Sequence, residues 1–211
     1  MKIRILASAA LALFVAAGLW LLSSPPRERS ESAPRLRGGV NGLDARGFSA
    51  LDWAARNGRT DAIRELVREG ADPNLRDDGP NRWPPLLHAV HKGQLASVRS
   101  LVTAGADVNG DNPRGLTPLM LACAQGEAEI VDELLADGAD PRRSQLGGET
   151  ALMYAMTEGD RRVIGSLLRK APDLRLGDSW KESFARFLAR LRGQSDVLAR
   201  LDHLQMAEGR R

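Results

Sequence analysis

Residues 117–142 read TPLMLACAQGEAEIVDELLADGADPR, the clearest copy of a pattern that occurs four times in this chain. Residues 49–74, 84–109 and 150–175 repeat its order of apolar, turn and polar positions. One glycine marks the same place in every copy, at intervals of 35, 33 and 33 residues: Gly58, Gly93, Gly126 and Gly159. A repeat of about 33 residues cannot bury its apolar face alone, so we expect the copies to stack in series.

Each copy predicts two short helices separated by the glycine. Leu119, Ala122 and Cys123 lie at helical spacing in the first helix of the clearest copy, where small side chains allow neighbouring helices to approach closely. Ile130 and Leu134 belong to an aliphatic stripe in the second helix. The glycine is expected to end the first helix in a turn that favours positive φ, and a Gly-Ala-Asp sequence ends the second.

The starts of two copies, Thr117-Pro118-Leu119 and Thr150-Ala151-Leu152, resemble the T-P-L-H-x-A signature of the ankyrin repeat. The family's His position holds other residues in all four copies. The resemblance covers roughly residues 44–175 and implies an all-α ankyrin-repeat solenoid. Within residues 40–177 it places four repeats, at about 44–76, 77–111, 112–144 and 145–177.

Two local features refine this interpretation. The Thr117 hydroxyl can cap the first helix of its repeat, and Pro118 suits the first turn because a proline there loses no intrahelical hydrogen bond. Residues 75–83 form a connection that is two residues longer than its counterparts and contains Asp77-Asp78-Gly79-Pro80. We expect these extra residues at the tip of a loop.

The N-terminal residues 1–22 predict a membrane anchor or a signal sequence. Residues 5–22 are 18 consecutive uncharged and mostly apolar residues after a short basic start, long enough to span a bilayer. Trp20 suits a membrane interface. Small residues around Ala16 also fit a cleaved signal, and a merely buried helix is a third alternative. Residues 23–39, rich in Pro, Ser, Arg and Glu, predict a disordered linker.

The expected location follows from this start. Lys2 and Arg4 favour an N-terminus inside the cell, while four arginines at residues 27–37 argue weakly for the opposite orientation. We expect a single-pass inner-membrane protein of a bacterium with its repeats in the periplasm. A soluble periplasmic or secreted protein, released by signal cleavage, is the alternative.

The C-terminal residues 178–211 predict a degenerate fifth repeat that caps the stack. Trp180, Phe184 and Leu188 share one side of a predicted helix, and Gly193 follows Gly159 by 34 residues, in phase with the earlier turns. A terminal repeat must cover the last apolar face and present a polar outer face. A small independent domain is the weaker alternative, because about thirty residues in two helices hardly fold alone.

Composition excludes several kinds of site. The net charge of +3 is mild, and no dense stripe of Lys and Arg indicates a nucleic-acid groove. A single cysteine, Cys123, allows neither an internal disulfide nor a cysteine-based metal cluster, and we expect it buried. His88 and His91 share a helix but have no carboxylate nearby in their own unit, so they make a poor metal site.

No catalytic residue, cofactor, metal site or small-molecule substrate is predicted. The chain has no G-x-S-x-G, no phosphate-binding loop and no G-x-G-x-x-G after a strand. Asp72, Asp107, Asp140 and Asp173 recur at one position of each copy. An active site occurs once, so this recurrence indicates a structural role.

The resemblance implies a protein partner held on the concave side, by loop tips and the exposed face of the first helices. Aromatic and basic residues dominate the N-terminal half of this set, and acidic residues its C-terminal end. Phe48 and Trp83 have the composition of an interface hot spot, although they can equally pack onto neighbouring loops. The candidates are Arg46, Phe48, Arg56, Asn57, Arg76, Arg82, Trp83, His91, Lys92, Arg114, Leu116, Gln125, Glu149 and Glu158.

The leading hypothesis is a non-enzymatic protein-binding module or scaffold, tethered at the bacterial inner membrane. By resemblance to bacterial ankyrin proteins, a stress-protective or immunity role is an alternative. A structural spacer of the envelope without a specific ligand is another, and an enzyme with an unrecognised site is the least favoured.

Overall fold

The computed structural model of this chain describes residues 39–174, 186–187, 189–190 and 192–199. Within them every regular element is helical, and pairing between extended residues is limited to two isolated bridges, Leu43 with Ser49 and Ser144 with Thr150. No helix of the described residues is both long enough and apolar enough to cross a bilayer. The predicted anchor at residues 1–22 and the linker up to residue 38 lie outside the described residues.

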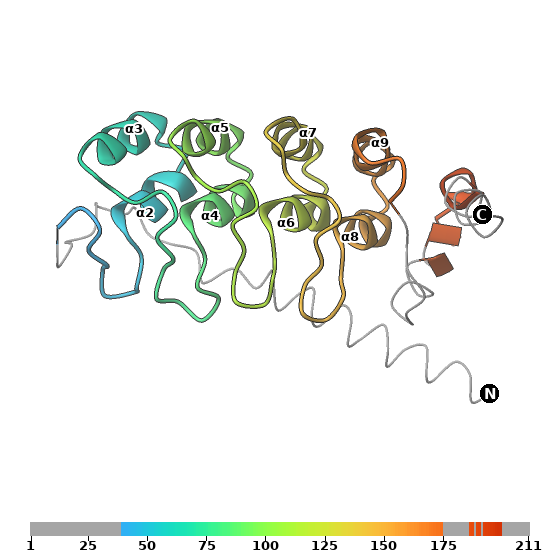
Figure 1. Cartoon of the computed structure of the whole chain (residues 1–211), viewed down its shortest axis with the longest axis horizontal. Helices are drawn as coiled ribbons and strands as arrows, with labels where there is room; N and C mark the ends of the chain where they lie inside the picture. The colour runs from blue at the N-terminus through green and yellow to red at the C-terminus, as the bar shows by residue number, and fades with distance from the viewer. Residues whose placement is uncertain (1–38, 175–185, 188, 191, 200–211) are drawn as a thin grey trace. The chain divides into compact units, whose positions relative to one another are not determined.

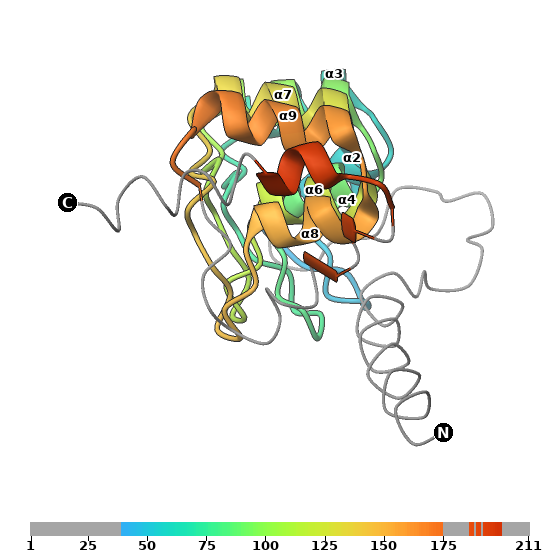
Figure 2. The ribbon, with the colours of Figure 1, turned by 90° about the vertical axis from the view of Figure 1, so that its right-hand side faces the viewer.

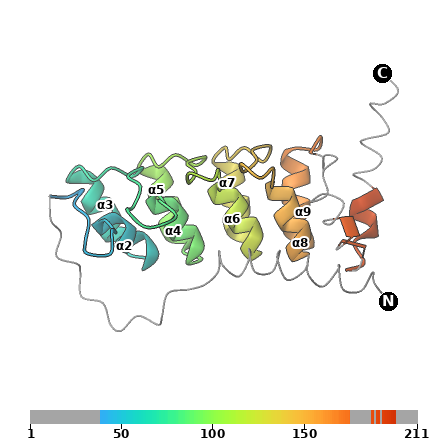
Figure 3. The ribbon, with the colours of Figure 1, turned by 90° about the horizontal axis from the view of Figure 1, so that it is seen from below.

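The helices form two layers, and both follow chain order (Figure 1). The outer layer lies along one side of the inner layer, as Figure 2 also shows, and Figure 3 shows the helix pairs following one another in chain order. Each helix packs against its partner in the same repeat and against its counterpart in the next repeat. The inner helices are α2 (Ala50–Arg56), α4 (Pro85–His91), α6 (Pro118–Gln125) and α8 (Ala151–Glu158); the outer helices are α3 (Thr60–Arg68), α5 (Leu95–Thr103), α7 (Ala128–Ala136) and α9 (Arg161–Lys170).

Side-chain caps fix where three of the inner helices, α2, α6 and α8, begin. The Thr117 hydroxyl accepts a hydrogen bond from Met120 N (3.2 Å), as the sequence predicts, and the Thr150 hydroxyl does the same for Met153 N (3.3 Å). In the first repeat Ser49 and Asp52 form a reciprocal capping box. These caps satisfy N–H groups that the first helical turn leaves without partners.

The glycine turns end the inner helices as predicted. Gly58 has φ +70° and Gly126 has φ +70°, in the left-handed region that glycine adopts without strain. A side chain of the next repeat lies against the turn, because a Cβ built on Gly58 would lie 2.6 Å from Gln94 Oε1. The turn therefore needs glycine for its backbone angle, and the Gln94 side chain of the next unit packs closely against it.

One continuous apolar seam joins the repeats. Leu51, Leu86, Leu119 and Leu152 occupy equivalent positions of the inner helices and are at most 1% exposed. Leu101, Leu134 and Leu167 are equivalent to one another in the outer helices and are fully buried. Their counterpart in α3, Leu66, is only half-buried, and no helix pair precedes α3 in the described part of the chain.

A ladder of asparagine side chains links successive outer turns. Asn74 donates to Gly105 O (3.2 Å) and accepts from Asp107 N (2.7 Å), so it bridges from its own repeat to the next. Asn41 and Asn109 make the equivalent pair of bonds. Arg142 occupies the next place in the ladder, where it pairs with Asp173 (2.5 Å) instead.

The described residues near the C-terminus repeat the turn geometry of the earlier units. Gly193 has φ +70°, and Gln194 N donates to Ala189 O (2.9 Å), as Glu127 N donates to Ala122 O at the equivalent place. The buried Gln194 side chain donates to Gly159 O (2.7 Å). These bonds connect the described C-terminal turn to the fourth repeat. The degenerate fifth repeat at residues 178–211 stays a prediction, because most of its apolar stripe lies outside the described residues.

Candidate protein-binding face

Four loops and the ends of the inner helices make up the surface where the sequence places a partner. The loops are residues 44–48, 75–83, 109–116 and 142–149, and we call them together the loop face. They extend from the inner layer on the side opposite the outer layer (Figure 1). Neighbouring loops are joined through their backbones, since Asp78 N donates to Gly47 O (2.9 Å) and Leu146 N donates to Arg114 O (3.0 Å).

Polar side chains fold the first three loops onto themselves. Asp44 accepts hydrogen bonds from Arg46 N (2.8 Å), Phe48 N (2.9 Å) and the Trp53 indole (3.0 Å). Partial burial opposes ionisation of Asp44, but these bonds and the Arg46 charge outweigh it and lower its pKa. Asn112 closes the third loop similarly, by accepting from Leu116 N at 3.0 Å. The loops are thus ordered before any partner binds.

The candidate residues differ in how far they reach the surface. Those with exposed side chains are Arg46, Asn57, Arg76, Arg82, Lys92, Arg114 and Glu158, and the half-buried ones are Phe48, His91, Gln125 and Glu149. Sequence analysis did not single out Leu146, although it is 85% exposed at the tip of the fourth loop. Its exposure could have been predicted from the sequence, because Leu146 stands between Gln145 and two glycines at the tip of a loop.

Three candidates are buried and do not present their side chains to a partner. Leu116 is 2% exposed, Trp83 is 5% exposed and Arg56 is 7% exposed. The Trp83 ring packs edge-on against His88 and His91, with ring centres 5.3 and 5.2 Å apart. Trp83 was predicted either to contact a partner or to pack within the protein. Its contacts with α4 and its low exposure favour packing within the protein.

Several arginines of the loop face are paired with acidic residues. Asp111 binds Arg76 (3.0 Å) from the preceding loop and Arg143 (3.1 Å) from the following one. Arg82 pairs with Asp78 at 3.4 Å. A partner that uses these guanidinium groups must therefore share them with, or take them from, carboxylates of this chain.

A buried polar cluster lies beneath the first two loops, and the sequence analysis did not foresee it. Asp77 was expected at a loop tip, but it is 3% exposed, while Asp78 and Arg82 of the same loop do reach solvent. Its carboxylate accepts from Trp83 N (3.0 Å) and Gly79 N (3.1 Å), and lies 2.7 Å from His88 Nε2. The only unusual feature of this loop in the sequence is its extra length of two residues, which does not specify the partners of Asp77.

His88 therefore does have a carboxylate partner, contrary to the expectation from its own repeat. Asp52 from the preceding repeat is fully buried and lies close enough to His88 for an electrostatic interaction, which favours the ionised form of Asp52. Burial raises the pKa of Asp52 to about 6, against the opposing effects of His88 and of hydrogen bonds from Ser49. Burial, with the nearby charges of Lys92 and Arg56, lowers the pKa of His91 to about 4.

These groups do not make a metal centre. No set of three His, Cys, Asp or Glu side chains in the described residues is arranged to hold a metal ion. Cys123 is fully buried in α6, as expected, and burial raises the pKa of its thiol above the ordinary value. A thiol in this environment stays protonated and is a poor nucleophile.

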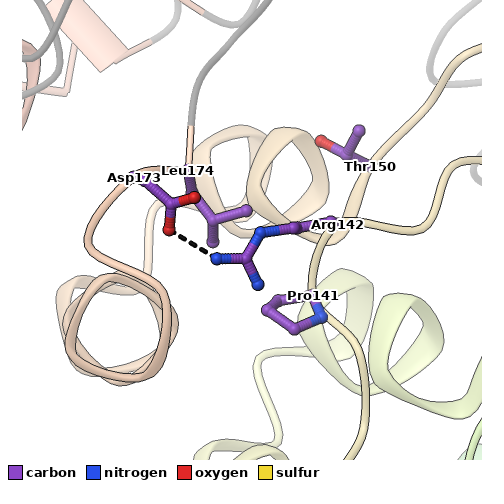
Figure 4. Close-up of a pocket in the computed structure, with 5 residues that line it drawn as sticks. All are labelled: Pro141, Arg142, Thr150, Asp173 and Leu174. Atoms are coloured by element: carbon purple, nitrogen blue, oxygen red, sulfur yellow. Dashed lines mark hydrogen bonds and ion pairs between the residues drawn. The ribbon is translucent and has the colours of Figure 1, made fainter.

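One open pocket of about 240 Å³ lies at the fourth repeat (Figure 4). Pro141, Thr150 and Leu174 line it together with the Arg142–Asp173 ion pair. The two charged groups that face it are paired with each other, and the Thr150 hydroxyl accepts a hydrogen bond from Met153 N. Its position coincides with the place where arginine interrupts the asparagine ladder.

Comparison with known proteins adds two findings. The model of a family described as ankyrin repeats (3 copies) matches residues 51–145 and 86–178, which together span more than half of the chain. A stretch of 69 residues, 33% of this chain, is 38% identical to part of the glycerophosphocholine phosphodiesterase gde1 of Schizosaccharomyces pombe. That stretch covers 6% of the phosphodiesterase.

Proposed function

Because this chain belongs to the ankyrin repeat family, we propose that it is a non-enzymatic module that binds a protein partner through the loop face. The observation that carries the proposal is the order of these loops in the free chain. Asp44, Asp77 and Asn112 each hold their own loop by accepting backbone N–H groups. A surface that is ordered beforehand loses little conformational entropy on binding, which favours affinity.

The exposed chemistry of the loop face suits a protein surface of mixed character. Leu146 offers an apolar anchor on the fourth loop, Arg114 offers a charged group on the adjacent third loop, and Arg82 offers another on the second loop. An interface of this kind combines a central apolar contact with a polar rim. The buried Trp83 and Leu116 support these loops from below.

We propose further that residues 5–22 tether the module to the inner membrane of a bacterium, with the repeats in the periplasm. The support is the length and apolar character of that run. Signal cleavage, which would release a soluble periplasmic or secreted protein, is the alternative. Fusing a reporter that is active only in the periplasm to the C-terminus tests the side, and carbonate extraction of membranes tests the tether.

The similarity to a phosphodiesterase does not change the proposal. The shared stretch is 6% of that protein, and we infer that the two chains share repeat units and not an activity. The described residues of this chain offer no nucleophile with an adjacent base at the pocket. Absence of phosphodiesterase activity in the purified full-length chain, measured on glycerophosphocholine, is the expected result.

Site-specific photo-crosslinking tests where the partner binds. A photo-reactive amino acid replaces Arg82, Arg114 or Leu146 on the loop face, and in matched controls it replaces Arg64 or Arg68 on α3. We expect one protein to be crosslinked in living cells from the loop positions and not from the α3 positions. Crosslinking of a protein from the α3 positions alone would show that the partner binds the outer layer, and would refute the proposal that it binds the loop face.

A further inference from the structure

The first two repeats meet at a polar cluster that has no counterpart at the later interfaces. Asp52 of α2 stands at a position that Leu87, Met120 and Met153 occupy in the other repeats. All four side chains are at most 5% exposed. Three of these four buried positions are therefore apolar, and the first holds a carboxyl group.

The cluster is bound to the loop above it by strong hydrogen bonds. His88 Nε2 lies 2.7 Å from one oxygen of Asp77, and the other oxygen accepts from two backbone N–H groups of the loop. The rings of Phe48 and Trp83 enclose His88, with centres 5.2 and 5.3 Å from its own. Asp77 and His88 thus hold residues 75–83 against α4.

Two atoms of this cluster have no hydrogen-bond partner among the described residues. They are Asp52 Oδ1 and His88 Nδ1, and both are buried. The other oxygen of Asp52 is held by the Ser49 N–H and hydroxyl, each at 2.8 Å. An ionised Asp52 therefore keeps one oxygen unsatisfied in the interior, which costs free energy, whereas a protonated Asp52 does not carry that charge.

We propose that Asp52, Asp77 and His88 form a pH-sensitive latch between the first two repeats, which takes up a proton and tightens as the pH falls through the weakly acidic range. Proton uptake removes the uncompensated charge at the interface of α2 and α4. Asp77 extends the effect to residues 75–83, because the same cluster closes that loop.

The surrounding charges set the size of the effect. Asp77 and His88 act on Asp52 with opposite signs, and Arg56, His88 and Lys92 act on His91. No group of α3, α5 or α6 is among the leading charges that act on either residue in the described part of the chain. His91, whose ring lies beside Trp83, is the one neighbour expected to oppose the latch.

The direction of the pH effect on this interface follows from the linkage between protonation and folding. The pKa of Asp52 is raised from 3.8 to about 6, so its stabilising contribution is present below 3.8 and is lost as the pH rises through 6. Between about pH 7.5 and about pH 5, the equilibrium constant for opening this interface should fall roughly tenfold. The pKa of His91 is lowered to about 4, so its contribution is lost as the pH falls below 6.5.

The experiment measures hydrogen–deuterium exchange in the full-length chain carrying His91→Gln, which removes the opposing group. Opening of residues 44–92 is compared at about pH 7.5 and about pH 5, after correction for intrinsic exchange rates. We expect opening to become roughly tenfold rarer at the lower pH, and the added Asp52→Asn change to abolish that difference. Glu69→Gln, at an exposed carboxylate of the same repeat, is the matched control and should retain it.

A second measurement needs no variant at the latch. The carboxyl carbon of Asp52, assigned by NMR through its own backbone in the native chain, should titrate with a midpoint near 6. A midpoint near the ordinary value of about 4 overturns the proposal. The proposal is also overturned if hydrogen exchange of residues 117–170 responds to pH as strongly as that of residues 44–92, because the latch acts only between the first two repeats.

Discussion

At the scale of single residues, Trp83 shows how a loop of the binding face is built into the core. It ends the second loop, lies 5% exposed and contacts both histidines of α4 through its ring. The adjacent Arg82 has an exposed side chain and a positive φ of 48°. Neighbouring residues of one loop therefore differ in role: Trp83 supports the loop from within, and Arg82 is exposed and is a side chain that we propose for contact with a partner.

Replacing Trp83 by Ala should destabilise the protein by about 3–5 kcal/mol, because it removes a large buried ring. Arg82→Ala should change the free energy of unfolding by no more than about 0.5 kcal/mol, since the side chain is exposed and its ion pair with Asp78 is weak. Urea denaturation of both full-length variants makes the comparison. Equal stability of the two would show that the ring does not support the loop.

Two glycines of the loop face form a matched pair for a backbone test. Gly115 has φ +81° and Gly148 has φ +84°, so alanine is strained by about 1–2 kcal/mol at either. A Cβ at Gly115 would also lie 3.1 Å from Gln145 Cα, whereas Gly148 has no neighbour within 4 Å. We expect Gly115→Ala to lower the melting temperature more than Gly148→Ala. An equal decrease would mean that the fourth loop, which contains Gln145, moves aside at little cost.

At the scale of the elements, short-range sequence patterns predicted the starts and ends of helices, but not contacts between distant residues. The helix start at Thr117 and the turn at Gly126 depend on residues within a few positions, and both agree with the structure. The burial of Asp77 depends on His88, eleven residues away, and on the rings of Phe48 and Trp83. No local pattern contains that information, so the polar cluster could not be predicted.

The candidate face was predictable to a similar extent. The repeat period placed Arg114 at a loop tip correctly, because its position in the unit determines the loop. It could not separate Leu116 from Leu146, since both are leucines in loops and only the packing of the neighbouring unit buries the first. Burial at a repeat interface is a property of two units, and one unit's sequence does not specify it.

The asparagine ladder gives a prediction for coupling between elements. Asn109→Ala removes the acceptor of Asp140 N (2.8 Å) and the donor to Gly138 O (3.4 Å). Each hydrogen bond contributes about 0.5–1.5 kcal/mol, and solvent can replace part of it here. Asn57→Ala, which loses a bond to Trp53 O inside one repeat, is the comparison. Exchange measurements should show α7 loosened relative to α5 only for Asn109→Ala.

At the scale of the whole described stack, stability depends on contacts between neighbouring units. In such a protein each interface contributes separately, and an end unit protects the one before it. Gln194 is 1% exposed and donates to Gly159 O (2.7 Å), so it connects the last described turn to the fourth repeat. The fourth repeat should therefore be the one most sensitive to changes near the C-terminus.

Gln194→Ala should leave the Gly159 carbonyl without this donor and cost about 1–3 kcal/mol. Hydrogen exchange should quicken in α8 and α9 and stay unchanged in α2 and α3, because the interface lost lies at one end. Ser195→Ala, at the exposed neighbouring position, serves as the control. Uniform loosening of all repeats would instead indicate that the stack unfolds as a single cooperative block.

Asp111 has a consequence for how binding responds to ionic strength. Its carboxylate bridges Arg76 and Arg143, so it braces three successive loops through partly exposed charges. Screening weakens such bridges, because the Debye length shrinks from about 8 Å at physiological salt to about 3 Å at 1 M. The spacing of the loops would then loosen, and affinity would fall in concentrated salt even for an uncharged partner.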